Sequence, residues 1–305
     1  MGLHPIGRAR GAALSLVMLV TLMASTASAQ RPSSTRDALR LAIEQLASPT
    51  QTTRDDAAAR ARALVEAEPR LRGTEAQWRR RLAWVRPGTT EAELRRRAHA
   101  TPEGAMSGGG GTTASYRLDD FWVAVVVLDA TDHVREIAEI VARARDVWVQ
   151  PPSGFTGRWR TYTAGGSLSH DIEYANGTYV RFAQYHDNGQ LAYEQRYVRG
   201  QIDGEERGFY PDGSRMYVIH HAMGRDVGHW VHWFANGQVQ LDQTYVAGEL
   251  DGVVTHYRED GSRQVVFLYE RGRELGQAAW DEHGTLQYAH GAADAWVRSE
   301  RPATH

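Results

Sequence analysis

The chain has 305 residues, of which 42% are hydrophobic and 24% are charged, and its formal net charge is −2. It contains no cysteine, which excludes disulfides, thiolate metal sites and lipidation at cysteine. All 35 basic residues are arginine, yet the near-neutral balance argues against a general polyanion binder, so no nucleic-acid partner is expected.

Residues 1–29 have the pattern of a secretory signal peptide. Arg8 and Arg10 supply a positive amino-terminal region, an apolar stretch follows, and Ala27-Ser28-Ala29 forms a small-residue cleavage site. The apolar stretch is shorter than the ~20 residues that a membrane-spanning helix needs. We therefore expect export to the periplasm or the extracellular space, and an uncleaved anchor is the alternative.

Residues 30–84 form a predicted helical region. Apolar side chains recur at helical spacing, for example at Leu39, Ile43 and Leu46. Pro49 interrupts the pattern, which predicts a break between two helices there.

Residues 85–150 predict a small α+β domain. Thr90 and Glu93 have the spacing of a helix capping box. The glycine-rich stretch Gly108–Gly111 predicts a loop, which is not a phosphate loop because no Lys-Ser/Thr and no helix follow it. Strands and a last helix are then predicted at Thr113–Leu118, Phe121–Leu128, Val134–Ile137 and Ala138–Asp146.

This segment resembles the SmpA/OmlA (BamE-like) and β-lactamase-inhibitor-like small domains of exported bacterial proteins. The resemblance rests on Gly88-Thr89-Thr90 before the helix and on Tyr116-Arg117-Leu118-Asp119-Asp120 in the sheet. The methionine and the later Leu-Gly-Pro of those domains are absent here. The resemblance implies a helix followed by a small antiparallel sheet, and residues 151–156, which contain Pro151-Pro152-Ser153-Gly154, predict a linker after it.

Residues 157–291 carry an internal repeat of about 24 residues. In each unit an aromatic residue precedes a turn glycine by four positions. The six pairs are Tyr162/Gly166, Tyr185/Gly189, Phe209/Gly213, Trp233/Gly237, Tyr257/Gly261 and Trp280/Gly284. Asn or Asp stands directly before four of these glycines. Asn-Gly and Asp-Gly supply the positive φ values of a tight hairpin turn and are the strongest short-range signal of a β-hairpin.

Each unit is therefore predicted to be one hairpin. Six hairpins would form an elongated, single-layer antiparallel sheet of roughly twelve strands, and the chain as a whole would be α+β. Residues 292–305 are left as a C-terminal tail.

The repeat resembles the MORN family in its bacterial MORN-2 or YwqK-type antitoxin-like form. The best unit runs from Gly228 to Gly237 and continues with Tyr245-Val246-Ala247-Gly248. The resemblance implies a non-catalytic interaction surface. The pattern breaks where Glu206 and Val254 replace its tryptophan and where His221 replaces its tyrosine.

Alternation along the strands predicts two aromatic faces. Tyr185, Phe209, Trp233 and Tyr257 are expected to form a packed ladder on one face, with Phe182, Trp230 and Phe234 on the other. The second set is either partly buried by its neighbours or a stripe that binds a ligand. The predicted binding patch consists of Trp230, His232, Phe234 and His256.

No catalytic residue, cofactor or bound metal is expected. The sequence has no Gly-x-Ser-x-Gly and no His-Glu-x-x-His. His232 and His256 hold equivalent positions two strands apart, about 10 Å, which is too far for one metal with bonds of ~2.0–2.1 Å. A zinc site from another pairing, such as His220 with His232, is the alternative.

The leading hypothesis is an exported interaction or scaffold protein that binds a protein partner through the repeats. The alternatives are a surface for membrane lipid or cell-wall polysaccharide, and an antitoxin-like neutralising protein. The identity of the partner and the oligomeric state stay open.

Overall fold

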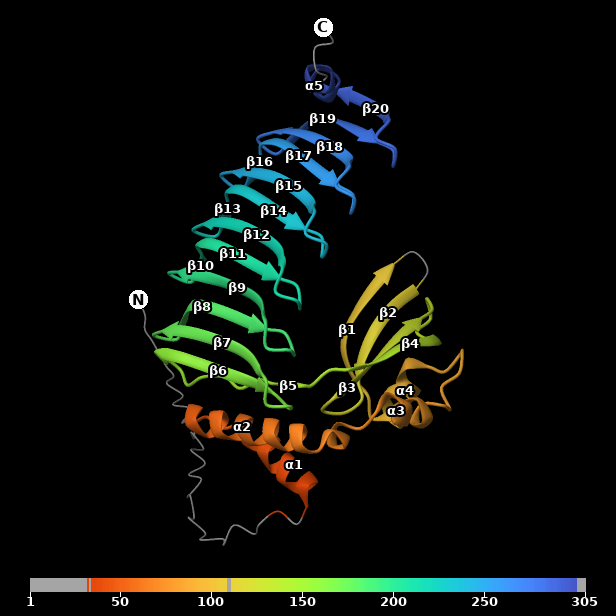
Figure 1. The fold of residues 1–305 in the computed structure, drawn as a ribbon, viewed down its shortest axis with the longest axis vertical. Coiled ribbons are helices and arrows are strands. Elements are labelled where there is room, and N and C mark those ends of the chain that lie inside the picture. Colours follow the sequence, from red (N-terminus) through yellow and green to blue (C-terminus); the bar gives the residue numbers. More distant parts are fainter. Residues whose placement is uncertain (1–31, 33, 109–110, 301–305) are drawn as a thin grey trace, which may run out of the picture.

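The computed structural model describes residues 32, 34–108 and 111–300, so the predicted signal segment 1–29 lies outside the described residues. The chain forms an N-terminal module of helices and a four-stranded sheet, followed by a long sheet of 16 strands (Figure 1). The α+β class and the elongated hairpin sheet are confirmed. None of the helices in the described part is long and apolar enough to cross a membrane.

Helices open the N-terminal module. They are α1 (Thr35–Gln45), α2 (Gln51–Ala67), the 3-10 turn η1 (Pro69–Arg72), α3 (Glu75–Arg81) and α4 (Glu91–Ala98). Local polar side chains start several of them: the Thr74 hydroxyl accepts a hydrogen bond from the Gln77 amide, and the Thr90 hydroxyl accepts one from the Glu93 amide. The second contact confirms the predicted helix start at Thr90.

The four-stranded sheet of the module is antiparallel, with the order β1-β2-β3-β4. Its strands are β1 (Thr101–Gly108), β2 (Gly111–Arg117), β3 (Trp122–Leu128) and β4 (Val134–Ala142). The first strand was not predicted. It lies at an edge of the sheet, where proline and glycine are tolerated, so its composition lacks the usual strand signal.

The predicted helix over Ala138–Asp146 is wrong. Residues up to Ala142 belong to β4, and Asp146–Val147 form β5, which pairs with the long sheet. The register of β4 shifts twice, leaving Arg135 and Ala138 as extra residues. Each bulge interrupts the two-residue alternation, so the apolar residues of β4 acquire a spacing that imitates a helix.

One hydrophobic core joins the helices to the small sheet. Leu46 of the helical part, Leu94 of α4 and Val126 of β3 are buried in it together. Tyr162 and Ala164 of the first repeat belong to the same cluster. The predicted helical region and small domain therefore share a core, which extends to the start of the repeats.

The long sheet is a succession of hairpins. Its longer strands are β6 (Gly157–Thr163), β7 (Leu168–Ala175), β8 (Thr178–Tyr185), β9 (Leu191–Val198), β11 (Gly204–Phe209), β12 (Arg215–Ala222), β14 (Gly228–Trp233), β15 (Val239–Val246), β17 (Gly252–Tyr257), β18 (Arg263–Glu270), β19 (Arg273–Trp280) and β20 (Leu286–Gly291). Short strands β10 (Gln201–Ile202), β13 (Arg225–Asp226) and β16 (Glu249–Leu250) pair with β9, β12 and β15. Sequence neighbours are spatial neighbours throughout, as expected for a repeat array.

Each repeat uses two different turns, and the tight one is not at the Asn-Gly or Asp-Gly position. Arg199 and Gly200 both have positive φ, 53° and 78°, and join Val198 to its partner Gln201. Two central residues with positive φ define the tight type I′ turn. The sequence pair that forms it here is therefore Arg-Gly.

The tight turns predicted at the four Asn-Gly and Asp-Gly pairs are wrong, because all six repeat glycines lie in wider turns. In each of them the glycine has positive φ but the residue before it does not; the glycines are Gly166, Gly189, Gly213, Gly237, Gly261 and Gly284, with φ of 79°, 84°, 87°, 83°, 83° and 77°. Each glycine amide donates to the carbonyl three residues earlier. The Asn188 side chain explains the wider form: its oxygen accepts from the Gln190 amide at 3.0 Å, which makes a local turn without positive φ at the asparagine.

Side chains of α2 cover the outer edge of the first repeat strand. The Gln51 side chain accepts from the Arg160 amide at 2.9 Å, and Arg54 Nε donates to the Arg160 carbonyl at 3.0 Å. Arg54 is fully buried, and its guanidinium lies 3.7 Å from the centre of the Trp159 ring. The backbone groups of Arg160 at this edge are thus paired without another strand.

A helix closes the other end of the sheet. Residues Ala292–Glu300, part of the predicted tail, form α5, which packs against β18, β19 and β20 (Figure 1). Trp296 of α5 meets Trp280 edge-on with ring centres 6.5 Å apart. Helices therefore lie at both ends of the repeat array.

Candidate interaction surface

The long sheet has an aromatic face and a charged face. Trp230 pairs with Gln243 and Val231 with Asp242, so paired and alternate residues share a face. Along β8–β18 the aromatic face carries Phe182, Tyr193, Tyr197, Tyr217, His221, Trp230, His232, Tyr245, His256, Phe267 and Tyr269. The charged face carries Arg181, Glu194, Glu205, Arg207, His220, His229 and Asp242.

Ring contacts run across the strands of the aromatic face. The Trp230 ring lies 4.3 Å from that of Tyr245 and 5.8 Å from that of His221. The rings of Tyr217 and His232 lie 5.4 Å apart. Contacts of this kind add to the free energy of area burial, by about 0.5–1.5 kcal/mol each. The face is therefore ordered by its own side chains.

The structure brings three of the four predicted patch residues onto the aromatic face. Trp230, His232 and His256 lie there, and the His256 ring meets that of Phe267 at 6.0 Å. Burial lowers the pKa of His232 and of His256. These two imidazoles are therefore held in a half-buried environment that favours the neutral form.

Phe234 lies apart from that patch, in the turn after β14. The equivalent residues of other units bind the backbone of the next unit. His186 Nε2 contacts the Phe209 carbonyl at 2.8 Å, and the Tyr210 hydroxyl donates to the Trp233 carbonyl at 2.8 Å. Phe234 has no polar group for this contact, so it breaks a row of side-chain links between turns.

The predicted ladder of Tyr185, Phe209, Trp233 and Tyr257 is wrong. These residues end their strands, and in the described part of the chain none of them makes a ring-to-ring contact. The aromatic contacts run along the opposite face, because there the rings stand at mid-strand positions that face one another across the pairing.

The glycines paired with that ladder shape the turns and do not contribute to the aromatic face. They lie beyond the strand ends, at Gly189, Gly213, Gly237 and Gly261, as does Gly284, which follows Trp280. Trp280, the last aromatic residue of the series, also ends its strand, but unlike the others its ring contacts Trp296 of α5. The sequence period of aromatic residue and glycine therefore marks where strands end, and the aromatic face is built from residues between these strand ends.

The charged face is linked by ion pairs. Glu194 contacts Arg181 at 3.0 Å and also pairs with Arg207. Burial acts to raise the pKa of Glu194, but the two guanidinium groups outweigh burial and lower that pKa overall. The polar side chains of this face thus pair with one another, and the aromatic rings lie on the opposite face.

The middle of the sheet carries no second layer. Among the described residues, no helix packs over β11–β17, and α2 and α5 lie at the two ends (Figure 1). The aromatic side chains there are covered only by their neighbours and are half-buried. The middle of the array therefore has an ordered aromatic surface that neighbouring side chains cover only in part.

One cluster on the aromatic face was not predicted as a site. His221 Nε2 lies 3.2 Å from Glu206 Oε2, and His221 Nδ1 lies 3.1 Å from Asp226 Oδ1. The sequence marks two of the three, since Glu206 and His221 were singled out as breaks in the repeat, but it does not show that they touch. No three His, Asp or Glu side chains of the described residues are arranged to hold a metal ion.

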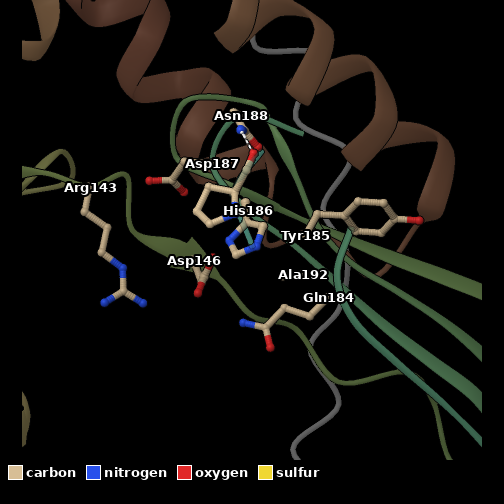
Figure 2. A pocket seen from close by; sticks show the side chains of 9 residues that line it. Arg143, Asp146, Gln184, Tyr185, His186, Asp187, Asn188 and Ala192 are labelled. Carbon is tan, nitrogen blue, oxygen red and sulfur yellow. Dashed lines mark hydrogen bonds between the residues drawn. The ribbon is translucent and has the colours of Figure 1, made fainter. Parts of the chain in front are cut away.

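A cleft of about 500 Å³ separates the module from the second repeat (Figure 2). Arg143 and Asp146 line it from the segment around β5, and His186, Asp187 and Asn188 line it from the turn after β8. Burial raises the pKa of Asp187, while Arg143 opposes that rise. The Asn188 amide donates to the Pro211 carbonyl at 2.5 Å, so this wall is built from inter-repeat contacts.

Comparison with known proteins identifies the repeat. A family model described as a MORN repeat variant matches residues 181–199, which lie in β8, β9 and the turns at their ends. No curated protein matches the chain. A chain in the crystal structure of a GtfA/B complex is similar at 14% identity and a TM-score of 0.16. The match covers 48% of this chain and 23% of that one, and at this score it carries no argument.

The hairpin matched by the family model has the same two turns and the same two faces as the units that follow it. The hairpin at residues 181–199 is thus a MORN-type repeat, and the units that follow it share its turns and faces.

Proposed function

We propose that the chain is an exported, non-catalytic interaction module that binds a protein partner through the aromatic face of its repeats. The observation that carries this proposal is the uncovered row of half-buried rings along β11–β17. Contiguous exposed apolar surface is uncommon on soluble proteins and marks interaction sites. Aromatic side chains are also enriched among the residues that dominate binding energy at interfaces.

The rigidity of the face supports the same proposal. Ring contacts and backbone pairing fix the side chains before a partner arrives. Binding then loses little side-chain entropy, which is about 0.5–1.5 kcal/mol for each side chain that must be immobilised.

The test uses two matched double variants on the same pair of strands. Trp230→Ala with Tyr245→Ala removes the central rings of the aromatic face. His229→Ala with Asp242→Ala removes a contacting pair on the charged face. Both proteins, checked for folding by circular dichroism, would be crosslinked in the envelope fraction, and the captured proteins compared.

We expect at least one protein that the wild type and the His229/Asp242 variant capture equally and that the Trp230/Tyr245 variant loses. Equal capture by all three proteins would contradict the proposal. Liposome and peptidoglycan co-sedimentation, run on the same variants, tests the lipid and polysaccharide alternatives. Sedimentation lost only in the Trp230/Tyr245 variant would replace the protein partner with that ligand class.

A further inference from the structure

At one place on the aromatic face, three positions of the repeat carry polar or charged residues where neighbouring units carry aromatic or aliphatic ones. Glu206 stands where the next unit has Trp230, His221 where it has Tyr245, and Asp226 where the flanking units have Ile202 and Leu250. In the next unit the corresponding rings contact each other at a tilt, with their centres 4.3 Å apart. Here the same two positions form a contact between the Glu206 carboxylate and the His221 imidazole at 3.2 Å. The other ring nitrogen of His221, Nδ1, contacts Asp226.

From β8 to β18, this cluster contains the only acidic side chains that lie on the aromatic face. Among the strand residues that strand pairing assigns to the aromatic face from β8 to β18, Glu206 and Asp226 are the only Asp, Glu or Arg. With His221 neutral or protonated, two carboxylates against one imidazole leave the cluster with net negative charge. An apolar surface thus has one negative centre.

Aromatic rings surround this centre. Tyr217 forms a hydrogen bond with Glu206, and burial followed by the Glu206 charge raises the pKa of both Tyr193 and Tyr217. Trp230 meets the His221 ring edge-on at 5.8 Å. Glu206 itself is accessible but shielded, with 15% of its side chain exposed.

We propose that this cluster binds a cationic side chain of the protein partner, an arginine or a lysine. A carboxylate offers about four lone-pair positions, and His221 and Tyr217 occupy two of them, which leaves two as acceptors for N–H donors. Aromatic faces attract the same cation through their quadrupoles. The proposal rests on the proposed function, since it names the chemistry of the partner on the aromatic face.

The test follows the imidazole and Trp230 signals by NMR while N-acetyl-arginine amide or N-acetyl-lysine amide is added. N-acetyl-citrulline amide, which has the shape of arginine without its charge, is the control ligand. Glu206→Gln removes the charge on the aromatic face. Glu205→Gln removes the adjacent charge on the other face, where Glu205 lies 3.5 Å from His220.

We expect saturable shifts at His221 and Trp230 with a cationic amide and none with the citrulline amide. Glu206→Gln should weaken binding about tenfold, as expected for loss of one charge-assisted contact, while Glu205→Gln leaves it unchanged. Equal shifts with the citrulline amide, no shifts at all, or equal weakening by both variants would overturn the proposal.

A second variant separates binding from folding. Glu206→Trp with His221→Tyr restores the residue pair of the neighbouring unit, so the sheet should keep its melting temperature or gain stability. This protein should be folded and yet bind no cationic amide. Retained binding would contradict the proposal. A loss of cation binding in a variant that still captures the partner would overturn this inference and leave the proposed function standing.

Discussion

Arg54 should be one of the most sensitive positions for stability, because it joins the N-terminal module to the repeat sheet. Its side chain is fully buried and donates to the carbonyls of Arg160 and Ser48 at 3.0 and 2.6 Å and to Gln51 Oε1 at 2.6 Å. It also lies over the Trp159 ring. Burial lowers the pKa of Arg54 because it removes water from around the charged guanidinium.

The magnitude of an Arg54→Ala change follows from these contacts. Hydrogen bonds to charged groups contribute about 1.5–3 kcal/mol each, and a desolvated cation–π contact about 2 kcal/mol. Relief of the buried charge offsets part of this sum. Removing one partner of a buried charged network generally costs about 3–5 kcal/mol, and we expect a loss of that size.

The assay is urea unfolding followed by tryptophan fluorescence and circular dichroism. Arg60→Ala is the matched control, because Arg60 lies on the exposed side of the same helix and should change stability by less than about 0.5 kcal/mol. If Arg54→Ala destabilised the protein by no more than Arg60→Ala, the account of Arg54 as a buried link would be refuted.

Two further predictions concern the aromatic face. Gly208→Ala would place a Cβ atom 2.2 Å from the Tyr217 ring, so the ring must move; we expect a loss of about 1–3 kcal/mol in urea unfolding, and an unchanged midpoint would contradict the contact. Burial lowers the pKa of His232 and His256, so the unfolded chain binds their protons more readily. The stability that these two histidines contribute is therefore present above about pH 6.5, their pKa in the unfolded chain. It is lost as the pH falls through their lower pKa values in the folded protein. The double change His232→Gln with His256→Gln, which places at both positions the residue found at Gln184, should flatten the pH dependence of the melting temperature, and an unaltered profile would show that burial of these rings is not its source.

The repeat could be predicted because its signal is local and recurs. A glycine that must adopt positive φ and an aromatic residue four positions earlier recur in every unit, so errors in one unit are corrected by the others. Strand β4, which contains Ala138, has no repeated signal of this kind. Two bulges disturbed its alternation, and a single unrepeated segment offered no second copy with which to compare it.

The site could be predicted only in part, for a related reason. Alternation placed Trp230 and His232 on one face, but Phe234 lies beyond the strand end, where alternation no longer applies. The contact between Glu206 and His221 joins residues 15 positions apart on paired strands. Both were visible as breaks in the repeat, yet their meeting depends on the strand register, which the sequence pattern alone does not fix.

Hydroxyl-radical footprinting of the free protein and of its captured complex tests whether the aromatic face is open in the free chain and binds the partner. We expect Tyr193, Trp230 and Tyr245 to be modified in the free chain and protected in the complex, while Tyr162, which is buried in the N-terminal core, is protected in both. Protection of the aromatic face already in the free chain, or equal modification with and without the partner, would contradict it.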